Sequence, residues 1–132
     1  MILDTNAYSA MARRLPSIVE SLTHASNLSL PLPVIAELRY GFAMGSQKDK
    51  NETLLERFLA QPQTQILTPS IATTRIYAEL QKYCREHGKA LSHNDIWIAA
   101  LAREHGDVLV TYDTDFSVFE DMFGDKLLLL RV

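Results

Sequence analysis

Five acidic residues fall where a chain of alternating strands and helices could use them for chemistry: Asp4, Glu37, Asp95, Asp113 and Asp115. Asp4 directly follows a short apolar run, and Asp113 and Asp115 follow a longer one at 108–111. Ligands of an open parallel α/β sheet bind beyond the carboxyl ends of its strands, so we expect these acids to meet at one edge. Clustered carboxylates repel one another unless a cation lies between them, and Mg²⁺ or Mn²⁺ prefers oxygen ligands of this kind. One or two ions held this way activate water and stabilise displacement at a phosphodiester.

Each acid also has a purely structural interpretation. Asp4 fits an Asx turn or a helix N-cap, and Asp113 and Asp115 fit similar roles, with Asp115 able to cap the short helix that follows. Asp95 fits the acidic position of a capping box opened by Ser92. Glu37 fits a solvated position on a helix, as is usual for glutamate, although apolar residues surround it in the sequence. The joint placement of all five favours a metal site over these separate explanations.

Short apolar segments alternate with amphipathic ones along the chain, and this alternation predicts the elements that position the acids. The expected strands are residues 1–3, 28–30, 66–67, 108–111 and 127–130. The expected helices are residues 7–14, 16–26, a helix entered near Pro33, one around 54–59, 71–87, 95–105 and a short one around Phe119. Residues 45–51 form a polar loop or begin a helix. Strands that are apolar on both sides and alternate with helices are typical of a mostly parallel sheet covered on both faces.

The composition is that of one ordinary globular domain spanning residues 1–132, with 47% apolar and 22% charged residues. A net charge of −3 argues against a broad basic surface for nucleic acid but leaves room for a local basic rim. The single cysteine, Cys84, excludes an internal disulfide and fits a reducing compartment. The longest apolar run, 96–102, is too short to span a bilayer, and no signal peptide is visible. We therefore expect a cytoplasmic protein with no membrane attachment.

Other catalytic signatures are missing from the sequence or incomplete in it. There is no Gly-rich phosphate loop, no GxSxG and no HExxH motif. A haloacid-dehalogenase-like phosphatase would need a second acid two residues after Asp4, where Asn6 stands. A phospho-receiver domain would need a lysine after the last strand, whereas Lys126 precedes it. A catalytically inactive module that binds nucleic acid or acts as a scaffold is a further alternative, although the presence of all five acids argues against it.

Four sequence segments occur together in a characteristic order: MILDTN at 1–6, PVIAELRYG at 33–41, HNDIWIAALA at 93–102 and LVTYDTDF at 109–116. In this order and spacing the chain resembles PIN-domain proteins. More narrowly, it resembles the VapC-type toxins of bacterial toxin–antitoxin pairs and their FitB-like relatives. Each segment alone is weakly specific, whereas the ordered set is specific and covers essentially the whole chain.

The resemblance implies a fold, an activity and a set of site residues. The implied fold is a PIN-like three-layer α/β sandwich, with a parallel sheet of about five strands in the order 3-2-1-4-5 covered by helices on both faces. The implied activity is that of a Mg²⁺- or Mn²⁺-dependent endoribonuclease. Its acidic positions fall on Asp4, Glu37, Asp95 and Asp113, with Asp115 close by as a further candidate metal ligand. The supporting polar positions of the family fall on Thr5, Asn6 and Thr111.

The resemblance also implies partners. These are an RNA substrate, a small VapB-like antitoxin that occludes the acidic pocket, and a second copy of the chain in a homodimer. Because the chain is acidic overall, we expect RNA to be held by a few rim cations, for which the candidates are Arg13, Arg14, Arg39 and Lys48.

Overall fold

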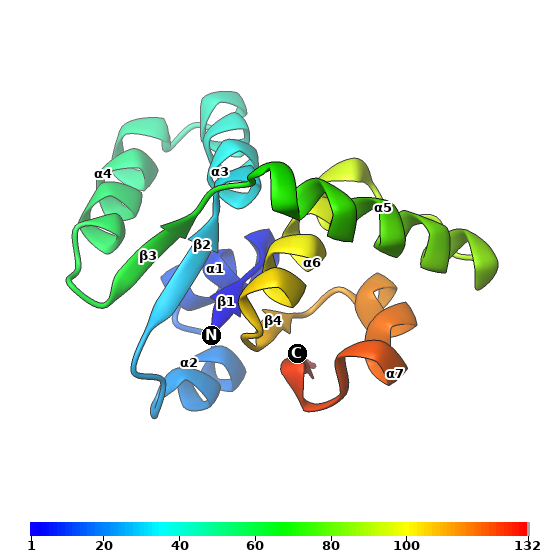
Figure 1. Cartoon of the computed structure of the whole chain (residues 1–132). Coiled ribbons are helices and arrows are strands. Elements are labelled where there is room, and N and C mark those ends of the chain that lie inside the picture. Colours follow the sequence, from blue (N-terminus) through cyan, green and yellow to red (C-terminus); the bar gives the residue numbers. More distant parts are fainter. Residues whose placement is uncertain (132) are drawn as a thin grey trace.

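A computed structural model describes residues 1–131 and contains a five-stranded parallel sheet (Figure 1). The strands are β1 (Ile2–Leu3), β2 (Leu28–Pro31), β3 (Thr64–Leu67), β4 (Leu109–Thr111) and β5 (Leu127–Leu129). Their order across the sheet is β3-β2-β1-β4-β5, which confirms the expected order and makes β1 the central strand. Each neighbouring pair is parallel, so all the carboxyl ends face the same edge. The residues that follow β1 and β4 therefore meet at that edge, as expected.

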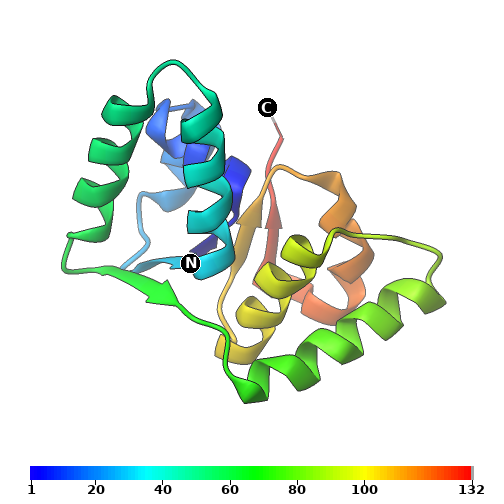
Figure 2. The ribbon, with the colours of Figure 1, turned by 90° about the horizontal axis from the view of Figure 1, so that it is seen from above.

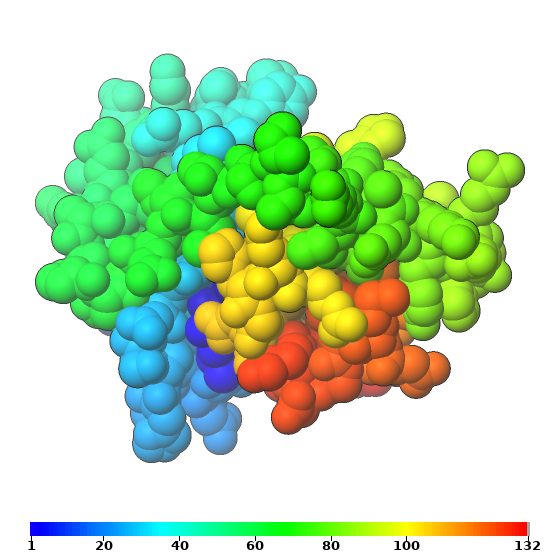
Figure 3. Space-filling model, in the orientation of Figure 1, coloured from blue at the N-terminus to red at the C-terminus, as the bar shows by residue number. Residues whose placement is uncertain are grey.

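Helices lie on both sides of this sheet. They are α1 (Thr5–Ala12), α2 (Pro16–Leu22), α3 (Leu32–Met44), α4 (Lys48–Leu59), α5 (Ile71–Glu86), α6 (His93–His105) and α7 (Glu120–Phe123), with 3₁₀ turns η1 (Thr114–Phe119) and η2 (Gly124–Lys126). Figure 2 shows α3 and α4 (cyan to green) on one side of β4 and β5, and α6 and α7 (yellow to orange) on the other. On the face shown in Figure 3, α5 (green) lies directly above α6 (yellow). Along residues 1–131, no helix combines the length and apolar character needed to cross a membrane.

Helix caps explain where two elements depart from their expected boundaries. α1 starts at Thr5, two residues earlier than expected, because the Asp4 side chain accepts the Ala7 N–H and caps the helix. α6 starts at His93, also two residues earlier, because Ser92 caps it. In addition, α2 ends before the expected boundary, and the polar segment after α3 contains the start of α4.

A core of fully buried apolar side chains holds the sheet edge at which the acids lie. Ile2, Leu3, Leu109 and Val110 on the two central strands have no exposed surface. On α6, every residue of the run 96–102 except Trp97 is at most 1% exposed. Full burial of a large apolar side chain contributes about 1.5–3 kcal/mol, so the ends of these strands and the first turn of α6 are held firmly.

Candidate functional site

Asp4 is the most buried of the five acids, with only 4% of its surface exposed. It ends the central strand and caps α1, so its backbone belongs to two fixed elements. Its Oδ1 accepts the Ala7 N–H at 2.8 Å, and its Oδ2 accepts the hydroxyl of the buried Thr111. The structural role expected for Asp4, a helix cap, is therefore confirmed, and it leaves lone pairs on both carboxylate oxygens available to a ligand.

The environment of Asp4 disfavours its ionised form. Burial is the main cause and raises its pKa from 3.8 to about 6, and the negative charges of Asp113 and Asp95 act in the same direction. The hydrogen bonds from Thr111 and Ala7 lower the pKa but do not offset the burial. A carboxylate of this kind gains from a nearby cation, because the cation restores the favourable energy of the ionised form.

Asp113 lies at the same edge, joined to Asp4 through Thr111. The Asp113 N–H donates to Thr111 Oγ1 at 2.9 Å, and the same hydroxyl group donates to Asp4. The Asp113 side chain accepts the Asp115 N–H at 2.9 Å and thereby caps η1. The prediction that Asp115 caps the short helix holding Phe116 is therefore wrong: Asp113 is the cap, because a side chain at this position reaches the N–H two residues on.

The Asp115 side chain instead forms an ion pair with Lys89. Lys89, in the connection between α5 and α6, lies with its Nζ 2.7 Å from Asp115 Oδ1. Among residues 1–131 this is the one ion pair that involves any of the five acids. Lys89 was not among the candidates named from the sequence, since nothing in its spacing relates it to Asp115.

Asp95 and Glu37 complete the set from two helices. The Asp95 N–H donates to Ser92 Oγ at 3.1 Å, which places Asp95 in the first turn of α6 and confirms one half of the predicted capping box, the cap by Ser92. Burial is the first cause that raises the pKa of Asp95, and the charges of Asp113, Glu37 and Asp115 follow. The charge of Asp95 in turn helps to raise the pKa of Asp4, so Asp95 interacts electrostatically with all four other acids.

Asn94 is a site residue that the sequence analysis missed. Its Nδ2 donates to Glu37 Oε1 at 2.8 Å and lies 3.4 Å from the carbonyl oxygen of Pro33. Asn94 therefore ties α3 to the first turn of α6 and holds Glu37 beside Asp95. The available signal was its position directly before Asp95. The neighbouring His93 instead contacts Tyr77 on α5, with Nδ1 2.5 Å from the hydroxyl oxygen.

The five acids share one electrostatic neighbourhood without forming a ready-made metal cage. Among residues 1–131, no group of three or more His, Cys, Asp or Glu side chains is arranged so that it could hold a metal ion directly. Three of the acids are engaged by other side chains, Asp4 by Thr111, Glu37 by Asn94 and Asp115 by Lys89. The donor set is nevertheless uniform, since every candidate offers carboxylate oxygens, the ligands that suit Mg²⁺ and Mn²⁺.

The supporting residues Thr5 and Asn6 follow Asp4 in the first turn of α1. Thr5 Oγ1 is buried and has no hydrogen-bond partner within residues 1–131. Such an atom is uncommon, because buried polar atoms are nearly always paired. Asn6 is exposed and borders a hollow shared with Arg13 and Tyr112.

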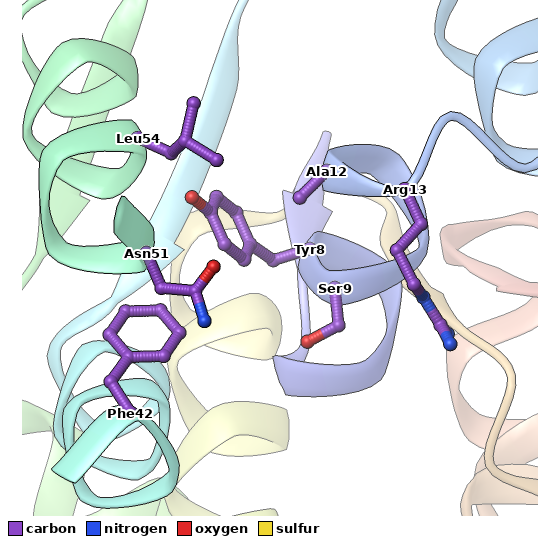
Figure 4. Close-up of a pocket in the computed structure, with 7 residues that line it drawn as sticks. All are labelled: Tyr8, Ser9, Ala12, Arg13, Phe42, Asn51 and Leu54. Atoms are coloured by element: carbon purple, nitrogen blue, oxygen red, sulfur yellow. The ribbon is translucent and has the colours of Figure 1, made fainter. Parts of the chain in front are cut away.

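The candidate rim cations are spread over different parts of the surface. Arg13 borders the hollow beside Asn6 and also a second hollow between α1, α3 and α4, drawn in Figure 4. Arg39 is paired with Glu52, with Nε 3.3 Å from Oε2. Arg14 and Lys48 are exposed. None of the five acids borders the hollow of Figure 4. Of the four cations, Arg13 is the one that shares a hollow with a residue of the candidate site, Asn6.

A family model, two relatives and a solved structure each match most of this chain. The model of the family described as PIN domain matches residues 1–121. "Toxin FitB" from Neisseria gonorrhoeae is 32% identical over 123 residues, which cover 86% of this chain and 88% of that protein. "Ribonuclease VapC2" from Rickettsia felis is 30% identical over 93 residues, which cover 70% of this chain and 68% of that protein. Among solved structures, VapBC2 from Rickettsia felis bound to a DNA fragment from its promoter aligns with a TM-score of 0.76 at 27% identity, covering 98% of this chain and 96% of the other.

Proposed function

This chain belongs to the PIN domain family, and we propose that it is a divalent-metal-dependent endoribonuclease that serves as the toxin of a toxin–antitoxin pair. The observation that carries the proposal is the position of Asp4. It is a buried carboxylate at the end of the central strand, within range of the charges of Asp95 and Asp113. The names of two relatives, Ribonuclease VapC2 and Toxin FitB, support a nuclease that acts as a toxin.

The residues we assign to the metal are Asp4, Asp95 and Asp113, with Glu37 beside them. Their oxygens suit Mg²⁺ or Mn²⁺, and the raised pKa of Asp4 is consistent with a carboxylate that gains from a cation. When bound, the ion supplies an activated water and stabilises the charge that develops on the phosphodiester.

The chain's own residues hold these oxygens in place. Asp4 is fixed by the Ala7 N–H and by Thr111, so its carboxylate has one orientation. Asp95 lies in the first turn of α6, where the helix dipole favours its ionised form. The Asn94 amide holds Glu37 in place through a 2.8 Å hydrogen bond. These contacts arrange the acids before substrate binds, which is the condition for efficient electrostatic catalysis.

The substrate we propose is single-stranded or looped RNA, because its phosphodiesters and bases are accessible to a protein surface. With a net charge of −3, the chain has to bind RNA through a few local cations. Arg13 is the best placed of the four candidates, since it lies beside Asn6. Arg39 is the least available because it is paired with Glu52.

The partners we propose are a small VapB-like antitoxin and a second copy of the chain. The alignment with the toxin–antitoxin complex VapBC2 over nearly the whole chain supports the first of these. The antitoxin would occlude the acidic pocket with a basic or aromatic side chain. The homodimer is supported by large apolar side chains that remain exposed on this single chain, such as Tyr40, Met44 and Ile71.

Cleavage of RNA by the purified chain tests the activity. We expect Mn²⁺ to support cleavage of a panel of messenger, ribosomal and transfer RNA, and EDTA to abolish it. Asp95→Asn removes one candidate ligand and should abolish cleavage, whereas Asp125→Asn changes an exposed carboxylate on η2 and should not. Inactivity of the wild type on the whole panel would instead favour an inactive nucleic-acid-binding module. The specific observation in favour of that second candidate is that no three acids within residues 1–131 already form a metal cage.

A further inference from the structure

Lys89 reaches the acidic edge because of how α5 ends. Gly88 adopts a left-handed backbone conformation, with φ of 65°, just after the last turn of the helix. The Lys89 N–H then donates at 2.9 Å to the carbonyl oxygen of Cys84, a residue that is 2% exposed. This is the usual way in which a glycine terminates a helix, and it fixes the direction in which the next side chain leaves. Lys89 is thus anchored by its backbone before its side chain meets Asp115.

The pair formed by Lys89 and Asp115 lies at the border of the candidate metal centre. The Asp115 N–H donates to Asp113 Oδ1 at 2.9 Å, and the charge of Asp115 contributes to the raised pKa of Asp95, so Asp115 lies beside the candidate site. Its Oδ1, however, lies 2.7 Å from Lys89 Nζ. Asp113, two residues earlier, forms no ion pair with any Lys or Arg of residues 1–131. Asp115 is therefore already paired with a cationic side chain of the described residues, whereas Asp113 is not.

We propose that Lys89 is a positioning residue that withdraws Asp115 from the metal-binding acids and leaves Asp113 as the acid of this segment that binds the ion. The inference rests on the proposed function. An ion that used Asp115 would compete with the lysine ammonium, 2.7 Å from Oδ1, for the charge of that carboxylate. The side chains of Lys89 and Asp115 are 41% and 48% exposed, so solvent screens the pair and makes it weak, and its removal should change metal binding only a few-fold.

The direct test is the affinity of the full-length chain for Mn²⁺ alone, measured from the electron paramagnetic resonance signal of the free ion. Lys89→Met frees Asp115 as an additional ligand, and we expect it to bind Mn²⁺ about two- to fivefold more tightly than the wild type. Lys89→Arg keeps the ion pair and should behave as the wild type does. Lys82→Met changes the net charge equally on the exposed surface of α5 and should have no effect.

A double-mutant cycle separates this role from a general effect of charge. In the Asp115→Asn background, Lys89→Met should leave Mn²⁺ affinity unchanged, because the residue through which Lys89 acts has been neutralised. Weaker or unchanged binding by Lys89→Met in the wild-type background overturns the proposal, as does an equal gain in both backgrounds. If Mn²⁺ affinity stays constant while the KM for RNA rises, Lys89 contacts the RNA instead. A wild-type chain that binds no Mn²⁺ refutes the proposed function together with this inference, whereas the other outcomes leave the proposed function standing.

Discussion

Asp4→Asn should remove the loss of stability that Asp4 causes in the metal-free protein as the pH rises toward neutral, while destroying its proposed site. The variant keeps the cap of α1, because an asparagine Oδ1 can accept the Ala7 N–H as the carboxylate does. It loses the hydrogen bond from the Thr111 hydroxyl, because the amide nitrogen that replaces Oδ2 cannot accept one. It removes the buried negative charge that lies near Asp113 and Asp95. We therefore expect an ordinary fold with a changed dependence of stability on pH.

The size of the effect follows from the pKa of Asp4. A pKa raised from 3.8 to about 6 corresponds to a penalty of about 3 kcal/mol when the group is ionised in the folded state, at 1.36 kcal/mol per pH unit. Because the folded-state pKa is the higher one, the contribution of Asp4 to stability is complete below pH 3.8 and is lost as the pH rises through 6. At pH 7.5 the full penalty applies to the wild type and not to the variant.

Thermal melts in EDTA between pH 4 and pH 8 measure this difference. For a chain of this length we expect the melting temperature of Asp4→Asn, relative to that of the wild type, to rise by about 10 °C between pH 4 and pH 7.5. Asp125→Asn, on the exposed surface of η2, is the matched control and should follow the wild type at every pH. A difference in melting temperature between Asp4→Asn and the wild type that stays constant from pH 4 to pH 8 would refute the reasoning, since burial would then carry no electrostatic cost.

Three further predictions concern metal, activity and assembly. Mg²⁺ or Mn²⁺ should raise the melting temperature of the wild type, with a stabilisation of about 2.7 kcal/mol at a hundredfold excess over Kd, and identical melts up to tens of millimolar metal would count against the site. In RNA cleavage assays Asp113→Asn should lose more activity than Asp115→Asn, because Asp115 is already paired with Lys89; the reverse order at unchanged melting temperature would reassign the ligand. Light scattering of the chain without antitoxin should give the mass of two chains, because Ile71 is 82% exposed and Tyr40 is 71% exposed on a single chain, and a monomer at high micromolar concentration would exclude the dimer.

The sheet and the location of the acids were predictable because they depend on patterns that are local in the sequence. An apolar run directly before Asp4 and another that ends two residues before Asp113 marked β1 and β4, and the parallel arrangement then brought their ends to one edge. The strand order itself came from the family resemblance, since apolar runs alone do not specify which strands are neighbours. The cap of α6 by Ser92 also followed from spacing, and the structure confirms it.

The contacts that tune the acids could not be predicted, because they join residues far apart in the chain. The hydrogen bond from Asn94 to Glu37 spans 57 positions, and the ion pair of Lys89 with Asp115 spans 26. Both depend on the path of a loop or on the relative placement of two helices, which no periodicity reports. The choice of Asp113 over its neighbour as the cap of η1 similarly depends on the backbone angles of one turn.

The most direct test of the central claim, that the acids at this sheet edge hold a catalytic metal ion, is the anomalous scattering of Mn²⁺ in crystals of the wild-type chain. We predict an anomalous peak within coordination distance of carboxylate oxygens of Asp4, Asp95 and Asp113, and its loss in crystals of Asp95→Asn. A manganese ion bound elsewhere on the chain, or no ion at this edge at saturating Mn²⁺, would contradict the account.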